Sequence, residues 1–318
     1  MVRQAGASTM NLTDPRFQDP QKAREYLETQ RWPDGPVCPH CGNCDHDNIT
    51  ALKGNAHRPG LYQCNECREQ FTVTVGSVME DSKIPLNKWL LAMHFLGASK
   101  KGMSAHQLHR MLGITYQSAW FLAHRIREAM TDSTPSPIGG QSNVVEADET
   151  YVGGKAINRA YKPEPKKHIG MSLVERGGEV RSFHVKNATA KTLRETAVKI
   201  ASRKSYLMTD ENPAYTKLGK EFDGHGTVNH SANEYVRLGG FVHVNSAENY
   251  FSIFKRGVVG TFHHISEQHL DRHLTEFDFR YNNRSKLGAE VAERSEKAIR
   301  GAAGKRLYYQ APREATHA

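Results

Sequence analysis

The sequence predicts an α/β domain in the second half of the chain, preceded by a small metal-binding ribbon and a helical domain. Three observations lead to this prediction: two Cys-x-x-Cys pairs, a helical apolar periodicity between residues 84 and 131, and a series of strand-like runs from residue 142 onward. The chain has 318 residues, which is enough for two or three domains and for a sizeable core in at least one of them.

The cysteine pairs lie at Cys38-Pro39-His40-Cys41 and at Cys64-Asn65-Glu66-Cys67. Paired knuckles of this kind are typical of a structural Zn²⁺ held by four thiolates, and the strand-like runs around the second pair match a zinc ribbon. We therefore predict a ribbon over residues 31–76 with Cys38, Cys41, Cys64 and Cys67 as zinc ligands. A redox pair or unrelated cysteines are the alternatives, and Cys44 is predicted to be a spare thiol.

Helical periodicity begins at Leu86, from which apolar residues recur every three or four positions. Ser104 and Thr115 are suited to cap the starts of two further helices, and Gly113 is suited to form the turn between them. Helices spaced in this way are typical of a helix-turn-helix domain, which we predict over residues 84–131.

The second helix of a helix-turn-helix lies in the major groove of DNA. Its candidate DNA contacts here are Tyr116 and Gln117 near its start, followed by His124, Arg125 and Arg127. The alternative is a plain three-helix bundle with a charged face.

The charge balance predicts a polyanionic partner. Lys and Arg number 43 and Asp and Glu 34, a net charge of +9 that suits either nucleic acid or an acidic membrane surface. The ribbon and the helix-turn-helix pattern favour DNA. No run approaches the roughly 20 apolar residues that cross a bilayer, and the N-terminus lacks the apolar segment of a signal peptide. We therefore expect a cytoplasmic protein.

The ends and the middle of the chain contain segments that we predict to lie outside the domains. Residues 1–30 are polar and interrupted by prolines, so we expect an arm in which only residues 21–30 are helical. Residues 131–143 have the composition of a linker, and residues 291–318 are predicted to form a basic polar tail.

A strand pattern over residues 144–154 contains three acids, Glu146, Asp148 and Glu149. Carboxylates near a core lose hydration and repel one another, so they require a cation, a basic partner or exposure to water. We predict that Asp148 binds a divalent metal ion and assign Glu146 and Glu149, on the alternate face or at the strand end, no catalytic role. The alternative is an edge strand whose acids face water.

Further strand and helix patterns follow this segment. They predict a hairpin of His168–Glu175 and Val180–Val185, a helix at 189–202, a strand at Tyr206–Thr209, a short helix at 213–221, a brief strand at 227–229 and helices at 246–257 and within 257–284. Asp210 directly follows the Tyr206–Thr209 strand, where α/β sheets place active-site acids. Glu248, Ser252 and Lys255 share one face of the helix at 246–257.

Three acids at separate positions suggest phosphoryl-transfer chemistry. This chemistry needs positioning and charge neutralisation, which two metal ions about 4 Å apart can supply. Asp148, Asp210 and Glu248 provide hard oxygen ligands suited to Mg²⁺ or Mn²⁺. None of the acids is specific alone, because an Asp at a strand end is more often a cap or a surface charge and a Glu such as Glu248 is more often a solvated helix residue.

Three sequence blocks together carry a family resemblance: Glu-Ala-Asp-Glu-Thr-Tyr-Val-Gly-Gly at 146–154, Thr-Asp-Glu-Asn at 209–212, and the segment at 243–264. In this order they resemble the DDE-type transposases of bacterial insertion sequences. More narrowly, they are similar to the subgroup with an N-terminal zinc ribbon and a ribonuclease-H-like catalytic domain. The resemblance covers roughly residues 20–290, and the last block is its most specific part.

The resemblance implies a ribonuclease-H-like mixed sheet with flanking helices over residues 142–290. It implies Asp148, Asp210 and Glu248 as the catalytic acids, although some members have Asn as the third residue and Asn249 follows Glu248 here. It also implies that Lys255 contacts DNA near the cut, and we expect Arg256 beside it to neutralise phosphates.

Two functions follow from these expectations. The first is an insertion-sequence transposase that binds double-stranded terminal inverted repeats, cleaves and transfers strands, and acts as a homodimer or larger assembly near the nucleoid. The second is a non-catalytic DNA-binding protein derived from a transposase. His263, His264, His269 and His273 are predicted to be ordinary residues near DNA, with a metal cluster as the alternative, and the resemblance places His230 near the active site.

Overall fold

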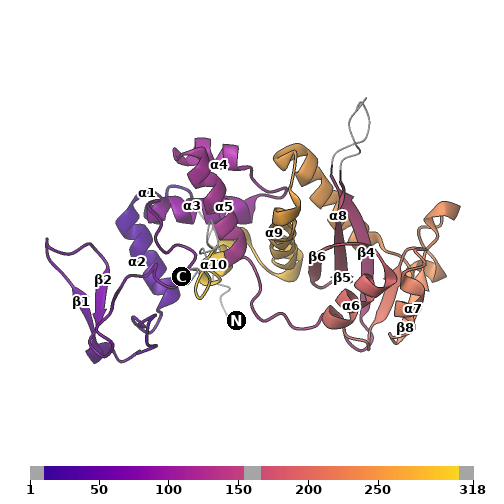
Figure 1. Cartoon of the computed structure of the whole chain (residues 1–318), viewed down its shortest axis with the longest axis horizontal. Coiled ribbons are helices and arrows are strands. Elements are labelled where there is room, and N and C mark those ends of the chain that lie inside the picture. Colours follow the sequence, from indigo (N-terminus) through magenta and orange to yellow (C-terminus); the bar gives the residue numbers. More distant parts are fainter. Residues whose placement is uncertain (1–10, 154–165, 308–318) are drawn as a thin grey trace, which may run out of the picture. The chain divides into compact units, whose positions relative to one another are not determined.

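The computed structural model describes residues 11–153 and 166–307, which form two compact units (Figure 1). Of these residues, the ribbon-helix unit holds 11–99, 103–131 and 290–307, and the sheet unit holds 100–102, 132–153 and 166–289. The candidate zinc ligands lie in the first unit and the candidate catalytic acids in the second. None of the described helices is long and apolar enough to cross a membrane.

The ribbon-helix unit combines a small antiparallel sheet with helices. The strands, in the order β1-β2-β3, are β1 (Ile49–Leu52), β2 (Leu61–Cys64) and β3 (Gln70–Phe71). The helices are α1 (Pro15–Gln18), α2 (Pro20–Arg31), α3 (Leu86–Ala98), α4 (Ala105–Leu112), α5 (Tyr116–Ala129) and α10 (Val291–Arg300).

The start of α4 and α5 follows the predicted caps. The Ser104 hydroxyl accepts a hydrogen bond from the Gln107 amide, and the Thr115 hydroxyl accepts one from the Ser118 amide. Gly113 ends α4 with a positive φ of 58°, a conformation that glycine adopts without strain. The local signals for the two helices of the helix-turn-helix pattern are therefore confirmed.

Both predicted peripheral segments contain helices that pack inside the ribbon-helix unit. Ala23 and Leu27 of α2 are buried, so this helix is not an isolated arm. Residues 291–300 form α10 rather than a loose tail, with Ala298 and Ile299 buried. The physical reason is an apolar stripe at three- and four-residue spacing, which is stable only when it is covered. Residues 308–318 lie outside the described part of the chain.

The sheet unit contains a five-stranded mixed sheet in the order β6-β5-β4-β7-β8. Its strands are β4 (Val144–Val152), β5 (His168–Glu175), β6 (Val180–Val185), β7 (Tyr206–Thr209) and β8 (Gly224–Thr227). β4, β5 and β6 run antiparallel, whereas β7 pairs with β4, and β8 with β7, in parallel. β4 is therefore the central strand, which excludes the edge-strand alternative.

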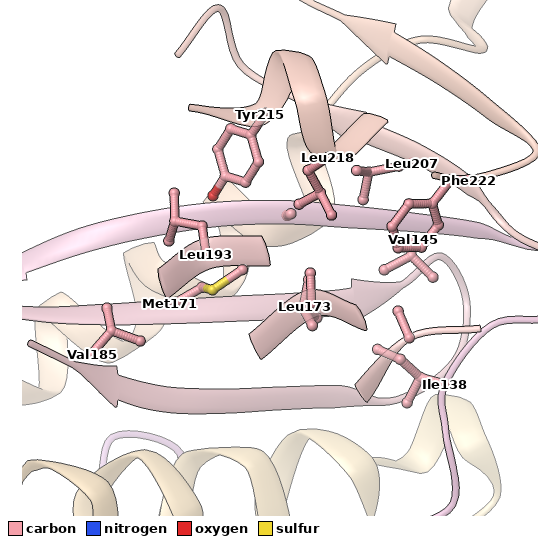
Figure 2. Packing of buried hydrophobic residues seen from close by; sticks show 13 residues of the cluster. Ile138, Val145, Met171, Leu173, Val185, Leu193, Leu207, Tyr215, Leu218 and Phe222 are labelled. Carbon is pink, nitrogen blue, oxygen red and sulfur yellow. The ribbon is translucent and has the colours of Figure 1, made fainter. Parts of the chain in front are cut away.

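Helices cover both faces of this sheet. They are α6 (Ala190–Ile200), α7 (Tyr215–Gly219), α8 (Asn245–Gly257) and α9 (Leu270–Asn282). α6 and α7 pack on the face that contains Val145 and Ala147 of β4, and Figure 2 shows this core. α8 and α9 pack on the opposite face, which contains Val152. Ile138, from the predicted linker, belongs to the core beneath α6.

The edge strand β6 is protected by side chains of α9. Asp278 accepts a hydrogen bond from the Ser182 amide at 2.7 Å, and Asp271 accepts one from the His184 amide at 2.7 Å. An uncovered edge would leave these amides free to pair with another chain. The mixed sheet with flanking helices confirms the predicted α/β, ribonuclease-H-like fold class.

The last strand differs from its predicted position of 227–229. β8 spans Gly224–Thr227, and a side chain at Gly226 would place its Cβ 2.6 Å from the Met208 sulfur. Glycine has a low strand propensity, which explains why the pattern did not reveal this strand.

Candidate active site and zinc site

The four predicted zinc ligands lie together. Their sulfur atoms are all within 4.8 Å of one another, and the Sγ atoms of Cys38 and Cys67, and of Cys41 and Cys64, are 3.7 Å apart. A tetrahedral site with Zn–S bonds of about 2.3 Å has S–S edges of roughly 3.8 Å, so the thiolate spacing fits Zn²⁺. Cys44 is exposed and lies outside this group.

The ribbon also has an aromatic core of its own. Trp32, at the end of α2, makes edge-to-face contacts with Tyr62 and Phe71, with ring centroids 5.6 and 5.7 Å apart. Phe71 is fully buried. The metal site and this cluster together hold the strands, because so few residues cannot form a large core.

Asp148 lies on β4, and Asp210 directly follows β7, the parallel neighbour of β4. The register pairs Glu146 of β4 with Met208 of β7. Asp148 and Asp210 are each two residues further along the sequence than these partners, in the same direction. Asp210 directly follows β7, and it lines an open cavity of ≈ 450 Å³ together with Thr227 of β8. The sheet thus brings the first two predicted acids to one place.

Glu248 lies in the first turn of α8 and is exposed. Its carboxylate Oε1 is 3.4 Å from the Nε2 atom of His230, which begins the short 3₁₀ helix His230–Ala232. His230 therefore neighbours one of the three acids, as the resemblance implied. Asn249 is also exposed, one position further along α8.

The acids influence one another electrostatically. Burial raises the pKa of Asp148 to about 7, and the charges of Glu149, Asp210 and Glu248 add to this effect. Burial likewise raises the pKa of Glu149, although a hydrogen bond from Tyr215 opposes the increase. A group of carboxylates with this repulsion favours a bound cation.

The three candidate acids are oxygen ligands whose atoms do not all gather around one point. Among the described residues, only two groups of three or more possible ligands have all their ligand atoms within 4.8 Å of one another, the four cysteines and His168, His184 and Glu267. Asp148, Asp210 and Glu248 are more widely spaced. Two ions about 4 Å apart are held by acids that do not all contact the same ion, so the residues present fit a two-ion site.

The histidine-containing group is explained by ion pairing. The Glu267 carboxylate lies 2.8 Å from the Lys166 ammonium, closer than to either His168 (3.6 Å) or His184 (3.9 Å). Lysine already supplies a cation to this carboxylate. Within the described part of the chain, His263, His264, His269 and His273 form no such group.

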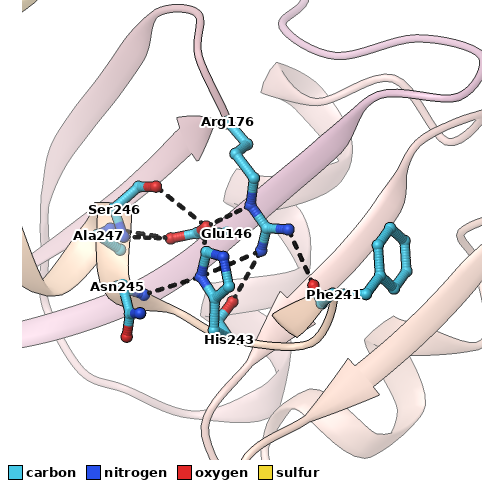
Figure 3. A network of polar contacts seen from close by, with 7 residues as sticks. All are labelled: Glu146, Arg176, Phe241, His243, Asn245, Ser246 and Ala247. Carbon is cyan, nitrogen blue, oxygen red and sulfur yellow. Dashed lines mark hydrogen bonds and ion pairs between the residues drawn. The ribbon is translucent and has the colours of Figure 1, made fainter. Parts of the chain in front are cut away.

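Glu146 is fully buried and connects β4 to the start of α8 (Figure 3). Its Oε2 atom accepts hydrogen bonds from the amides of Ser246 (2.7 Å) and Ala247 (3.1 Å). Its Oε1 atom accepts one from the Arg176 guanidinium at 2.8 Å and lies 3.3 Å from His243. Since strand side chains alternate, Glu146 shares the face of Asp148, and the expectation of an alternate face was wrong for Glu146.

Glu149 points to the other face and contacts the segment after β7. Its carboxylate accepts hydrogen bonds from the Asn212 amide group at 2.5 Å and from the Tyr215 hydroxyl. The backbone amide of Asn212 in turn donates to Asp210 Oδ1 at 3.1 Å. Sequence reasoning missed these contacts. The only available signal was the two-residue alternation, which separates Glu149 from the other two acids.

The candidate DNA contacts of α5 divide into two groups. Tyr116 and Gln117 are exposed at its start. Arg125 is buried, donates a hydrogen bond to the Glu80 carbonyl and lies over the Trp89 ring at 5.7 Å, so its prediction as a DNA contact was wrong. His124 and Arg127 are buried as well. The face of α5 that carries these three residues packs against the interior of the unit. Their polar side chains had suggested an exposed face.

The basic residues of α8 lie on its exposed surface. Lys255 and Arg256 are both exposed in the last turn, and Ser252 is exposed one turn earlier, so these positions lie on the solvent side with Glu248. The buried side of α8 includes Tyr250, Phe251 and Phe254. The predicted division of this helix into an apolar and a polar face is confirmed.

We expect Cys64→Ser to lose the zinc and to unfold the ribbon, because three thiolates cannot complete the tetrahedral site. Metal content by atomic absorption and limited proteolysis of residues 35–75 measure the two effects. Cys44→Ser is the matched control and should retain one zinc per chain. Equal zinc content in both variants would contradict the assignment.

We also expect Asp148 to lower the stability of the folded protein as the pH rises, whereas most carboxylates in folded proteins do the opposite. Its folded-state pKa of about 7 exceeds the usual value of about 3.9. The contribution of Asp148 to stability is therefore present at low pH and is lost as the pH rises from about 4 through about 7. In buffer without Mg²⁺ or Mn²⁺, thermal unfolding should show wild type losing stability over this range relative to Asp148→Asn. Parallel pH curves would contradict this.

Two family models match the chain. The transposase zinc-ribbon domain matches residues 19–70, and the ISXO2-like transposase domain matches residues 140–282. The two matches together span more than half of the chain. A relative described as an uncharacterized protein in transposable element ISH50 of Halobacterium salinarum is 26% identical over 294 residues, covering 86% of this chain and 95% of that protein.

Solved structures show only weak similarity. A chain of the simian T-cell lymphotropic virus intasome in complex with PP2A regulatory subunit B56 gamma has a TM-score of 0.28 and 14% identity, over 57% of this chain and 66% of that one, slightly less than two thirds. A chain of the Mos1 transposase paired-end complex with left transposon end has a TM-score of 0.21 and 11% identity, over 61% and 76%. These scores are too low to support a conclusion. The two family models, in contrast, identify the chain as a member of the DDE-type transposases that carry an N-terminal zinc ribbon.

Proposed function

We propose that this transposase binds the terminal inverted repeats of its element and uses divalent metal ions to cleave and transfer DNA strands. The observation that carries the proposal is the register of β4 and β7, which brings Asp148 beside Asp210. Glu248 contributes to the raised pKa of Asp148, which supports its place in the same site. These are oxygen ligands of the kind that Mg²⁺ and Mn²⁺ prefer.

Asp148, Asp210 and Glu248 would hold the metal ions. Bound Mg²⁺ or Mn²⁺ would supply an activated hydroxyl nucleophile and would neutralise charge at the reacting phosphate. The protein residues position the ions and the DNA. His230 lies 3.4 Å from Glu248 and is suited to interact with that carboxylate.

DNA would be held by positive charge and by a recognition helix. Lys255 and Arg256 extend from the exposed surface of the helix that carries Glu248, so they are suited to contact phosphates near the cut. Tyr116 and Gln117 are exposed at the start of α5, where helix-turn-helix proteins read base edges. Synapsis of two DNA ends calls for at least two copies of the chain, and we propose a homodimer or a larger assembly.

Asp148→Asn should reduce strand cleavage by on the order of 10³-fold, about 4 kcal/mol of activation free energy, because the amide is a poor metal ligand. The measurement is nicking of a DNA fragment that carries the element's end, with Mg²⁺ or Mn²⁺. Glu195→Gln, an exposed change on α6, is the matched control.

The same experiment separates the two candidate functions. A non-catalytic DNA-binding protein would bind the fragment, yet the wild type would nick it no better than Asp148→Asn does. That result would contradict the catalytic function and support the non-catalytic DNA-binding function.

Lys255→Gln should weaken DNA binding equally for all sequences. In a plot of log affinity against log salt concentration, loss of one phosphate contact reduces the magnitude of the slope by about one. Fluorescence anisotropy at several salt concentrations measures this slope. Lys191→Gln, exposed on α6, should leave the slope unchanged, and an equal slope in both variants would contradict the contact.

A further inference from the structure

Asp148 is flanked on β4 by two acids whose side chains leave opposite faces of the sheet. Glu146 shares the α8 face, and Glu149 lies on the α7 face. Each acid contacts the segment that carries one of the other two candidate catalytic acids. This arrangement is unusual because a carboxylate in the interior of a sheet loses its hydration and needs replacement donors.

The α8 helix depends on Glu146 for its N-terminal cap. Val244 is the N-cap residue and provides no side-chain hydrogen bond. The Asn245 amide donates to His243 Nδ1 at 3.3 Å, and the next two amides, of Ser246 and Ala247, bond to Glu146. Glu146 accepts from Ser246 and Ala247, and its negative charge interacts favourably with the positive end of the helix. Glu248 is the next residue along, so Glu146 determines where the first turn that carries Glu248 sits relative to β4.

Arg176 holds the Glu146 carboxylate in this orientation. Its Nε atom donates to Glu146, while its terminal nitrogens donate to the carbonyls of Phe241 (2.8 Å) and His243 (3.1 Å). Figure 3 shows the guanidinium between the carboxylate and the chain that leads into α8. The entry to the helix is therefore attached to β4 at two places, the first amides and the preceding loop.

On the other face, Glu149 attaches the segment that carries Asp210. Tyr215 is fully buried in the core beneath α6, so its hydroxyl has a fixed position from which it donates to Glu149. Asn212 donates its side-chain amide to Glu149 and its backbone amide to Asp210. The chain from Asp210 to Tyr215 is thus held against β4 by one carboxylate.

We propose that Glu146 and Glu149 are positioning residues that set the places of Glu248 and Asp210 relative to Asp148. The inference rests on the proposed function, because it assigns to two further carboxylates the assembly of that metal site. Neither residue is a metal ligand in this proposal. Groups that orient metal ligands usually affect metal affinity by roughly 10- to 100-fold when they are removed.

Two substitutions test the two contacts with minimal change of shape. Glu146→Gln removes the negative charge at the start of α8, and Tyr215→Phe removes only the hydroxyl that donates to Glu149. Arg176→Lys is a second variant on the Glu146 side, since it keeps the charge but loses the guanidinium geometry. Glu195→Gln, exposed on α6, is the matched control.

The primary readout is Mn²⁺ binding to the full-length free protein, followed by electron paramagnetic resonance, which does not depend on activity. We expect each variant to need roughly 10-fold or more Mn²⁺ for half-saturation. Nicking should show the same shift in its Mn²⁺ dependence and should recover as Mn²⁺ is raised. A purely structural loss would lower the folded fraction, measured by circular dichroism, without moving the half-saturation point.

Hydrogen exchange provides a second readout that is specific for each contact. Glu146→Gln should speed exchange at the Ser246 and Ala247 amides, and Tyr215→Phe should speed it at the Asn212 amide. Unchanged exchange, or unchanged Mn²⁺ half-saturation in folded variants, would overturn the inference. Failure of the proposed function is distinct, because Asp148→Asn would then nick as well as wild type.

Discussion

The cost of placing carboxylates inside a protein governs the sheet unit. β4 is the central strand, and Glu146 on it is fully buried while Asp148 and Glu149 are partly buried. Each buried carboxylate loses several hydrogen bonds to water, and the protein must replace them or shift the pKa. The three acids meet this requirement in three ways, which gives each of them a different chemical character.

Glu146 is neutralised by Arg176 and by the amides of α8, so its charge is satisfied within the protein. Glu149 receives two uncharged donors, which bind the carboxylate but leave its charge near the site. Within the described part of the chain, the Asp148 side chain accepts a hydrogen bond only from the Glu149 amide. It also has the raised pKa of about 7, so Asp148 is the acid with the most to gain from an added cation.

Local features of this chain could be predicted from the sequence because short-range physics determines them. The Ser104 and Thr115 caps act over three residues, and each Cys-x-x-Cys pair places its two thiols close together. The position of Asp210 directly after a strand was predictable because a strand end followed by proline is visible in the sequence. Features that depend on distant partners were not found. Glu146 was assigned no role since its partners lie at 176 and 243–247.

Burial of charge shows the same limit. Arg125 was expected on the DNA side of α5, but its guanidinium lies over Trp89 and bonds to the Glu80 carbonyl. A helical periodicity identifies two faces, and it cannot say which charged residue has a partner in another segment. The apolar stripe on α10 shows the opposite error, because a segment predicted to be a loose tail is partly buried. Its apolar residues are few, yet they are buried against the α3 helix, where Arg294 also donates to the Gly97 carbonyl.

The central position of β4 explains how adjacent acids can serve different parts of one site. A strand places successive side chains on opposite faces, so only a strand with helices on both faces can reach two helical layers from neighbouring residues. Glu146 reaches α8 and Glu149 reaches the segment before α7, while Asp148 remains between them. On an edge strand covered on one side, one of these contacts would face water. The order of the strands and the arrangement of the candidate acids therefore depend on each other.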